Sequence, residues 1–424
     1  MALSRPEKSW ILYDVANSAF VLIVTTTLMP IFFKSHAASG MTADRATAYW
    51  GFTVAAASLM VAVAAPFVGT LADFKGYKKK MLAGAVALGV LTTLLLTLVR
   101  PGQWLLCLVL YAVARIGFSG ANIFYDAFLV DVTTDDRMDR ISAYGYGWGY
   151  IGSVIPFLAS IGVLFLARGM LRADNFPVVA FAAAFAMTAA WWAVFSIPIL
   201  KNVQQNHFTA PSKRPLLASV LTLINTIEKV RQHKNIAVFL LAYFFYIDGV
   251  HTIISMALAY GMDQRLSQII LISVVLLIQV LGWPCAILFG LLAARVSAKF
   301  MILAGIGVYC LLTVVGYLLP VIEDPGHKVA VFFAMGFLIA LAQGGVQSLS
   351  RSFFGRMIPK DQAAEFFGFY NIFGKFAAII GPGLMGLATL LTGSSRYGVL
   401  SILGLFLVGG GLLYLVKRPE GRVG

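Results

Sequence analysis

Six ionisable residues stand inside long apolar stretches of this sequence, where a charged side chain needs a specific reason to be present. They are Asp14, Arg115, Asp126, Asp248, His251 and Lys375. A carboxylate or an imidazole can bind and release a proton, and an arginine or a lysine can bind an anionic group. These residues are therefore the first candidates for binding or proton-transfer chemistry.

Uncharged polar residues share a helix face with several of them, if each apolar stretch is a helix turning by about 100° per residue. The predicted polar stripes are Asp14, Ser18 and Thr25; Arg115, Asn122 and Asp126; Asp248, Thr252 and Ser255; and Gln343, Gln347 and Ser350. We expect substrate contacts from these stripes and from Asn17. Contacts that only bridge two helices are the alternative for Gln343 and Gln347.

Depth separates the charged residues into two groups. At about 1.5 Å per residue, Asp248 and Lys375 lie about 18 Å, and Arg115 about 16 Å, from the start of their stretches. We expect a binding site in which Asp248 is shared by Arg115 and Lys375, with His251 one turn away. A structural ion pair is the alternative for Arg115, and a side chain reaching the lipid headgroups is the alternative for Lys375.

Asp14 and Asp126 lie near the ends of their stretches, and we expect them to approach each other. Desolvation and like charge would then make one of them a proton carrier, as we also expect of Asp248. Hydrogen bonding to Tyr13, Asn17 or Tyr125 is the structural alternative.

Aromatic and basic residues complete the candidate set. We expect Trp148, Tyr370 and Asn371 to contact the substrate, although helix packing alone could explain the aromatic residues. The basic residues Arg351, Arg356 and Lys360 are expected to form a charge network with Asp361 or Glu365 rather than a substrate site.

The composition excludes a soluble protein. The 424 residues are 60% hydrophobic and 12% charged, whereas soluble domains carry about 25% charged residues. Phosphate-binding loops and metal-ligand motifs are not present, and the three cysteines lie in apolar stretches. We therefore expect neither an enzyme nor a cofactor, catalytic residues, a metal site or a disulfide framework.

Apolar runs of 18 residues or more predict an all-α, polytopic membrane protein with 12 transmembrane helices. The spans are 10–33, 49–71, 80–99, 104–130, 142–166, 176–199, 236–260, 267–291, 299–319, 329–349, 363–391 and 397–416. The polar interval 201–235 is predicted to be a cytoplasmic linker with an amphipathic helix. It divides an N-terminal six-helix bundle, residues 1–200, from a C-terminal one, residues 236–424.

Basic residues predict the orientation. With both termini in the cytoplasm, 22 of the 32 Lys and Arg residues are cytoplasmic and 8 lie in outside loops. Cytoplasmic loops are enriched in these residues. We expect a monomer in a bacterial cytoplasmic (inner) membrane, with the lipid bilayer and no nucleic acid as a partner.

A glycine-rich loop follows the second span. It reads Gly69-Thr70-Leu71-Ala72-Asp73-Phe74-Lys75-Gly76-Tyr77-Lys78 and resembles the signature of the major facilitator superfamily, with Phe74 and Tyr77 in place of arginines. Gly69 permits close helix contact, Gly76 permits a tight turn, and Asp73 can lie at the positive N-terminus of a neighbouring helix. The corresponding loop after the eighth span keeps Gly290 but has lost the acid. The resemblance implies a cytoplasmic gate that includes Gly69, Asp73, Gly76 and Lys78.

A narrower resemblance covers nearly the whole chain. The residues that carry it are Tyr13-Asp14-Val15-Ala16-Asn17-Ser18-Ala19-Phe20, Ser350-Arg351-Ser352 and Phe367-Gly368-Phe369-Tyr370-Asn371. They resemble the branch of the superfamily that contains the fungal vacuolar amino-acid effluxers of autophagy. Val15 departs from that branch, which has an aromatic residue there. The resemblance implies two pseudo-symmetric bundles and a carrier of small molecules, with amino-acid efflux as the best-known activity.

We therefore expect a secondary active transporter that moves a small polar or zwitterionic solute by alternating access, coupled to protons. An uncoupled facilitator of another small organic solute is the first alternative, and a non-transporting membrane receptor or scaffold is the second.

Overall fold

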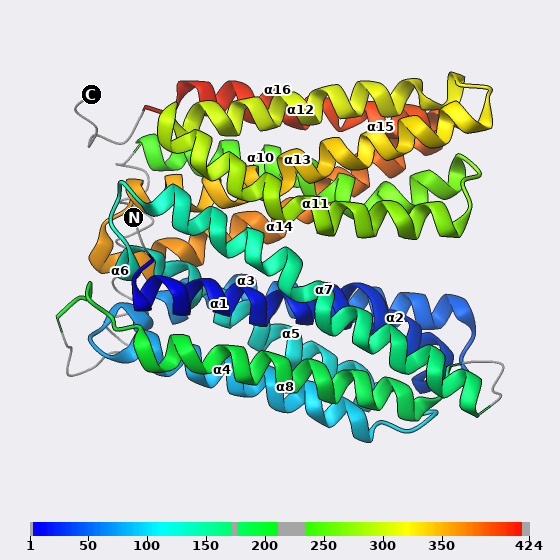
Figure 1. The fold of residues 1–424 in the computed structure, drawn as a ribbon, viewed down its shortest axis with the longest axis horizontal. Helices are drawn as coiled ribbons and strands as arrows, with labels where there is room; N and C mark the ends of the chain where they lie inside the picture. The colour runs from blue at the N-terminus through cyan, green and yellow to red at the C-terminus, as the bar shows by residue number, and fades with distance from the viewer. Residues whose placement is uncertain (1–2, 172–175, 211–233, 418–424) are drawn as a thin grey trace. The chain divides into compact units, whose positions relative to one another are not determined.

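The computed structural model describes residues 3–171, 176–210 and 234–417, and its elements are helices, with one isolated β-bridge between Phe74 and Thr209 (Figure 1). Within these described ranges, ten helices are long and apolar enough to cross a membrane, or eleven if the bent pair Tyr49–Ala65 and Phe67–Asp73 is one span. The predicted polytopic all-α fold is confirmed. The predicted span 363–391 corresponds to α14, Ala363–Thr392, whose side chains at 375–379 lie outside the description. Most of the predicted linker, residues 211–233, also lies outside the described residues.

The helices form two compact units, and two helices contribute to both. Unit 1 comprises Met1–Val132, Trp148–Ser219 and Asp361–Gly368, and unit 2 comprises Thr133–Gly147, Val220–Lys360 and Phe369–Gly424. The first residues of α7, Met138–Met170, therefore belong to unit 2, and the rest of that helix belongs to unit 1. The first residues of α14 belong to unit 1, and the rest belongs to unit 2.

Unit 1 contains the helices that follow one another from the N-terminus. They are α1 (Arg5–Ala19), α2 (Met29–Phe32), α3 (Ala43–Asp73), α4 (Tyr77–Leu95), α5 (Trp104–Ala127), α6 (Leu129–Val132) and α8 (Val178–Asn202). The start of α1 is set by local chemistry. Ser4 and Glu7 form a capping box, in which each side chain bonds to the other residue's backbone N–H, and this arrangement satisfies two free amides of the first turn.

Unit 2 contains the helices of the second half of the chain. They are α10 (Lys234–Asp263), α11 (Gln268–Arg295), α12 (Ala298–Leu318), α13 (Pro325–Met357), α14, α15 (Ser395–Ser401) and α16 (Leu403–Leu415). Asp324 caps α13 by accepting a bond from the N–H of His327 at 2.6 Å. Pro325 then occupies the first turn, where its missing N–H costs nothing.

The first span is not a regular α-helix, because α1 continues into a π-helix, Phe20–Leu28, and a second π-helix covers Phe33–Ala37. A π-helix bonds residue i to residue i+5 and turns less per residue than an α-helix. The backbone N–H of Met29 shows this pattern by donating to the carbonyl of Val24. The predicted alignment of Thr25 with Asp14 assumed α-helical rotation throughout, and the π-helix changes the rotation after residue 19.

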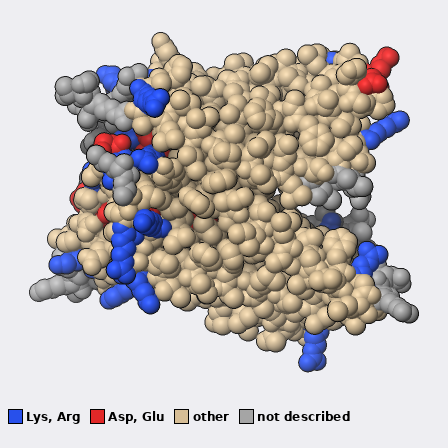
Figure 2. All heavy atoms as spheres, viewed as in Figure 1, with Lys and Arg blue, Asp and Glu red and all other residues tan. Residues whose placement is uncertain are grey.

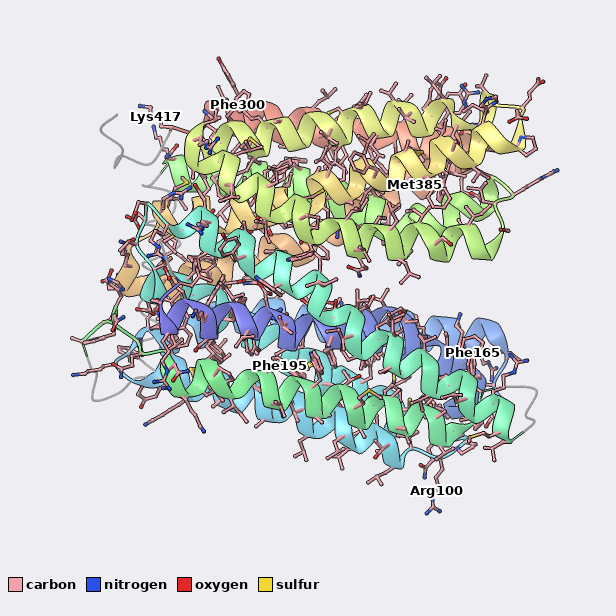
Figure 3. All side chains as sticks on the ribbon, in the orientation of Figure 1. Arg100, Phe165, Phe195, Phe300, Met385 and Lys417 are labelled. Atoms are coloured by element: carbon pink, nitrogen blue, oxygen red, sulfur yellow. The ribbon has the colours of Figure 1, made fainter. Side chains whose placement is uncertain are left out.

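Large apolar side chains cover the outer surfaces of the helices in each unit. Figure 2 shows mostly uncharged surface, with Lys, Arg, Asp and Glu gathered toward the helix ends. Phe165 and Phe300, labelled in Figure 3, are 58% and 55% exposed, and Leu390 is 83% exposed. An exposed apolar surface of this extent is unfavourable in water and suits contact with lipid.

Candidate functional site

Asp248 lies on α10, in unit 2, and its side chain is fully buried. Its Oδ1 atom accepts a hydrogen bond from the backbone N–H of Gly381 on α14, with a donor–acceptor distance of 3.0 Å. Its Oδ2 atom is buried and has no hydrogen-bond partner among the residues that the structure describes. A buried carboxylate oxygen without a partner is costly, so Asp248 can accept a proton or a cationic group there.

Gly381 allows α14 to approach Asp248 closely. A Cβ atom at this position would overlap Oγ1 of Thr252 and would lie 2.9 Å from Oδ1 of Asp248. Thr252 lies one turn after Asp248 and donates to its backbone carbonyl at 2.7 Å. Pro382, next to Gly381 inside α14, interrupts the helix hydrogen bonding. A glycine amide beside an interrupted turn therefore holds one oxygen of Asp248.

Two other predicted site residues pack along the same two helices. Tyr370 stacks on Tyr243 with ring centroids 4.2 Å apart and on Phe354 with centroids 5.1 Å apart. His251 is half-buried and is hydrogen-bonded to the backbone of Gly374. The stack joins α10, α13 and α14, so packing accounts for the aromatic character of Tyr370.

In unit 1, Asn17 and Asn122 meet directly. The Nδ2 atom of Asn17 donates to Oδ1 of Asn122 at 2.9 Å, and this bond links α1 to α5. Arg115, two turns before Asn122 on α5, is half-buried and contacts the hydroxyl of Tyr111 at 3.5 Å. Ion pairs to Arg115 are absent among the residues that the structure describes. A guanidinium in this position is available for an anionic partner.

Tyr125 is the partner of Asp14. Its hydroxyl donates to Oδ2 of Asp14 at 2.7 Å, and its backbone carbonyl accepts a bond from Nε1 of Trp10 at 2.9 Å. Asp126, the next residue, is 9% exposed. The hydrogen bond from Tyr125 corresponds to the structural alternative for Asp14.

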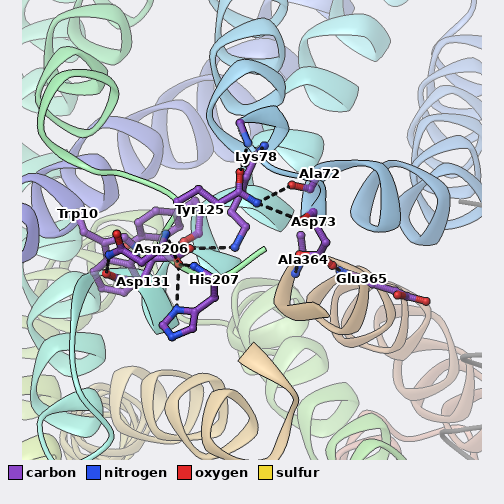
Figure 4. A network of polar contacts seen from close by, with 12 residues as sticks. Trp10, Ala72, Asp73, Lys78, Tyr125, Asp131, Asn206, His207, Ala364 and Glu365 are labelled. Atoms are coloured by element: carbon purple, nitrogen blue, oxygen red, sulfur yellow. Dashed lines mark hydrogen bonds and ion pairs between the residues drawn. The ribbon is translucent and has the colours of Figure 1, made fainter. Parts of the chain in front are cut away.

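A second group of predicted residues surrounds the end of α3. Asp73 accepts hydrogen bonds from the backbone N–H groups of Ala364 and Glu365, both at 2.8 Å (Figure 4). These amides lie in the first turn of α14, where N–H groups have no partner inside the helix and the helix dipole favours an anion. A Cβ atom at Gly69 would lie 2.5 Å from the Ala364 carbonyl oxygen, so close contact here requires glycine.

Gly76 and Lys78 complete the turn after α3. Gly76 has φ = +80°, a conformation that favours glycine, and is the N-cap of α4. The ammonium group of Lys78 lies 2.9 Å from Oδ2 of Asp131, and both side chains have no exposed surface. Asp131 lies on the short helix α6 and was not among the predicted site residues. The turn is therefore fixed by a buried ion pair that reaches α6.

The start of α7, in unit 2, is held by basic and hydroxyl side chains of α13. Asp139 accepts a bond from the Ser352 hydroxyl at 2.6 Å and pairs with Arg356 at 2.7 Å. A Cβ atom at Gly290 would lie 3.1 Å from the Asp139 carbonyl oxygen and would overlap Ala143. The loop that lost its acid therefore keeps the close contact, and Asp139 on α7 itself supplies the negative charge.

The basic residues 351, 356 and 360 have partners around the start of α7. Arg351 is 3% exposed, donates to the Ser142 hydroxyl at 2.9 Å and lies over the Tyr146 ring, 4.5 Å from its centroid. Lys360 pairs with Asp135 at 3.0 Å. These contacts join the end of α13 and the residues just after it to the start of α7 and the residues just before it. The expected network with Asp361 or Glu365 stays a prediction.

The remaining predicted residues lie on α7, α13 and α14. Gln343 and Gln347 are half-buried on α13, and Trp148 is 45% exposed on α7. Asn371 is half-buried on α14. The side chain of Lys375 lies outside the description, so its predicted contact with Asp248 stays a prediction. Groups of three or more His, Cys, Asp or Glu placed to hold a metal ion do not occur among the described residues.

Comparison with known families decides the classification of this chain. The family model described as "Vacuole effluxer Atg22 like" matches residues 5–138 and 130–424. The chain belongs to this Atg22-like family. An uncharacterized transporter of the major facilitator type, YxiO of Bacillus subtilis, is 45% identical over 98% of the Atg22-like chain and 95% of its own length.

Fungal relatives are more distant. Autophagy-related protein 22-1 of Penicillium rubens is 29% identical over 67% of the Atg22-like chain, which spans 50% of the fungal protein. Another fungal relative, autophagy-related protein 22 of Kluyveromyces lactis, is 25% identical over 78% of the chain.

Solved structures show the fold of the Atg22-like protein. A proton:xylose symporter, XylE, aligns with a TM-score of 0.72 and 11% identity, covering 99% of this chain and 96% of its own. A second transporter of the superfamily, FucP, aligns with a TM-score of 0.71 and 12% identity, covering 98% of both chains. The Atg22-like protein is a multi-pass membrane transporter of the major facilitator superfamily and not an enzyme.

Proposed function

We propose that this Atg22-like protein is a secondary active transporter that moves a small polar or zwitterionic solute by alternating access, coupled to protons. An amino acid is the first choice of solute, and efflux is the first choice of direction, in keeping with the family's description as vacuole effluxers. The observation that carries the proposal is Asp248, which is fully buried in an apolar helix and has one oxygen without a hydrogen-bond partner among the described side chains and backbone groups.

Asp248 and Arg115 have complementary chemistry for a zwitterion. The Oδ2 atom of Asp248, which no described group binds, can accept a hydrogen bond from an ammonium group or can take up a proton, while Gly381 holds Oδ1 in place. The guanidinium of Arg115 can bind a carboxylate through two parallel N–H donors. Asn17 and Asn122, which are hydrogen-bonded to each other, would exchange that bond for contacts with the solute.

Proton coupling is proposed for Asp248, with Asp14 and Asp126 as further carriers. An ionisable group inside a membrane span is costly and is a functional candidate by default. The hydrogen bond from Tyr125 to Asp14 supports the alternative, an uncoupled facilitator in which the acids only organise the helices. An imposed proton gradient distinguishes the two functions, because only the coupled transporter accumulates solute against its concentration gradient.

Alternating access requires contacts that form and break at the helix ends. We propose that Gly69, Asp73, Gly76 and Lys78 form such a gate on the cytoplasmic side. The N–H groups of Ala364 and Glu365 are satisfied by Asp73 in this structure, and water can replace Asp73 when the helix end moves away, because N-terminal amides are accessible at a helix end. The contact between Asp73 and α14 can therefore stabilise the state in which the gate is closed, and it can break when the gate opens.

The orientation of the protein in the membrane is part of the same proposal. We place both termini in the cytoplasm of a bacterial cell, with the bilayer as the protein's surroundings, the monomer as its state and two six-helix halves as its repeats. Single cysteines introduced at the exposed residues Lys75 and Arg100 test this orientation. A membrane-impermeant thiol reagent added to whole cells should label the cysteine at 100 and leave the one at 75 unlabelled.

The function is tested with purified protein. A thermal-shift screen against amino acids, peptides, sugars and nucleosides first identifies a ligand, because a ligand that binds the folded state raises the melting temperature. Uptake of that ligand into reconstituted vesicles is then measured with and without an imposed proton gradient. We expect gradient-dependent accumulation by the wild type.

Two matched variants locate the activity. Asp248→Asn should abolish accumulation, whereas Asp263→Asn, the same change at an exposed position of the same helix, should transport like the wild type. Melting temperatures near that of the wild type establish that both variants are folded. Normal accumulation by Asp248→Asn would overturn the assigned role, and absence of flux for every ligand found would favour the receptor or scaffold.

A further inference from the structure

We propose that the segment 203–209, which follows α8, positions the gate loop, and that Gln205 is the main positioning residue. By this proposal, the state of the Asp73 contact with α14 depends on the chain between the two halves. The inference rests on the proposed gate role of Asp73, and it assigns a function to residues that the gate motif does not include.

Gln205 binds both ends of the loop with one side chain. Its Nε2 atom donates to the carbonyls of Ala72 and Asp73, at 3.1 and 3.3 Å, at the C-terminal end of α3. Its Oε1 atom accepts from the N–H groups of Gly76 and Lys78, at 3.0 and 3.4 Å, at the start of α4. These are backbone groups that helix ends leave without partners.

The loop needs this external cap because of its own residues. The N-cap of α4 is Gly76, which has no side chain to bind the first amides of the helix. The C-cap of α3, Phe74, is extended and has a side chain without polar atoms. Serine, threonine, asparagine or aspartate normally satisfies the amides at a helix start. Gln205, from a distant part of the sequence, does so here.

Asp131 links the same segment to Lys78. Its Oδ2 atom binds the Lys78 ammonium group, and its Oδ1 atom accepts from the backbone N–H groups of Asn206 and His207, at 2.9 and 2.8 Å (Figure 4). The Nδ2 atom of Asn206 also donates to the Asp131 carbonyl at 2.8 Å. One carboxylate therefore joins the loop lysine on one side and the 203–209 segment on the other.

The end of the segment reaches the residue that caps α14. The N–H of Thr209 donates to the backbone carbonyl of Asp73 at 2.9 Å, and Phe74 and Thr209 form a parallel bridge. Lys75 lies over the Phe208 ring, 5.2 Å from its centroid. The backbone of Asp73 is thus held by Gln205 and Thr209 while its carboxylate binds the first turn of α14. Displacement of the 203–209 segment would remove the hydrogen bonds that fix the backbone of Asp73, and with it the position of the Asp73 carboxylate.

The test compares two neighbouring glutamines. Gln204 is exposed, whereas Gln205 makes the four contacts described above, so Gln204→Ala is a matched control for Gln205→Ala. Hydrogen exchange, followed by mass spectrometry on the full-length protein in lipid nanodiscs, reports on the amides of residues 363–367. Exchange there should be on the order of tenfold faster in Gln205→Ala, as expected for the loss of a few hydrogen bonds, and unchanged in Gln204→Ala.

A conservative variant separates positioning from general destabilisation. Gln205→Glu keeps the acceptor for the amides of α4 but loses the donor to the carbonyls of Ala72 and Asp73. It should therefore give exchange rates between those of the wild type and Gln205→Ala. Exchange in α12, which belongs to unit 2, should be the same in all variants. Faster exchange everywhere in Gln205→Ala, or equal exchange at 363–367 in Gln204→Ala and Gln205→Ala, would overturn the proposal.

Failure of the gate assignment gives a different result. If Asp73→Asn speeds exchange at residues 363–367 but leaves transport unchanged, Asp73 caps α14 without gating transport. The effect of Gln205→Ala on the same amides would still establish the positioning role. If Asp73→Asn stops transport and Gln205→Ala changes neither exchange nor transport, the gate stands and the role of the 203–209 segment fails.

Discussion

The ammonium group of Lys78 and the carboxylate of Asp131 form an ion pair at 2.9 Å with neither side chain exposed. The two partners are not equivalent. Asp131 also accepts hydrogen bonds from two backbone N–H groups of the 203–209 segment. Lys78, in contrast, pairs with no acid other than Asp131 among the described residues. The pair therefore depends more on its acid than on its base.

This asymmetry predicts unequal effects of removing each partner. Asp131→Asn leaves a buried ammonium group without a counterion and should lower the free energy of unfolding by about 3–5 kcal/mol. Lys78→Met leaves an aspartate that keeps its backbone donors, so we expect about 1–3 kcal/mol. Melting temperatures measured in detergent show which of the two variants is less stable. Equal melting temperatures would show that the donors from the segment do not stabilise Asp131.

Gly69 should tolerate no side chain, because a Cβ atom there would meet the backbone of Ala364. Gly69→Ala should destabilise the protein by about 1–3 kcal/mol, as overpacking usually does, and should weaken the cap that Asp73 forms on α14. Gly84→Ala on α4 is the control, because a Cβ atom there meets nothing within 4 Å. We expect it to be neutral or stabilising by up to about 1 kcal/mol. Thermal unfolding and hydrogen exchange at residues 363–367 compare the two.

Gly381 and Gly383 form a second matched pair, on α14. A Cβ atom at Gly381 would overlap Thr252, whereas one at Gly383 meets nothing within 4 Å. Gly381→Ala should separate α10 from α14 and remove the bond to Asp248, at a cost of about 1–3 kcal/mol, and should reduce transport. Gly383→Ala should keep both stability and transport. Loss of transport in both variants would point to helix flexibility instead of the Asp248 contact.

The contacts at the start of α7 predict a contrast between two ion pairs. Arg356 and Asp139 are 14% and 3% exposed, and Lys360 and Asp135 are 38% and 51% exposed. Asp139→Asn should be clearly destabilising because it weakens contacts to both Ser352 and Arg356. Lys360→Met should change the free energy of unfolding by at most about 1 kcal/mol, the usual range for an exposed pair. The melting temperatures of the two variants test this prediction. It fails if Lys360→Met lowers the melting temperature more than Asp139→Asn does.

The helical fold could be predicted from the sequence because apolar runs of 18 or more residues have few other structures in a membrane. The approach of Asp73 to a helix N-terminus could also be expected from the motif and from helix electrostatics. Its role as a gate stays a prediction. The face of the first span could not be predicted beyond Ala19, where the π-helix begins, because a run of apolar residues does not distinguish a π-helix from an α-helix.

Partners far apart in the sequence escaped prediction for a different reason. Asp131 and Lys78 are separated by 53 positions, and Gln205 and Gly76 by 129. A single sequence carries no signal that pairs such residues. Asp131 gave a weak signal, as a second acid shortly after Asp126 at the end of a span. Gln205 gave no signal, because a polar residue within a polar interval of the sequence is not unusual.

The division of α14 between the two units has a consequence for synthesis of the chain. Residues Asp361–Gly368 belong to unit 1, although the other residues of that unit end at Ser219. A ribosome must therefore add more than a hundred further residues before the carboxylate of Asp73 can meet the amides of Ala364 and Glu365. Until then, Asp73 in the nascent N-terminal half lacks the α14 amides that it binds in the folded protein. Unit 1 can therefore be completed only after nearly the whole protein has been translated.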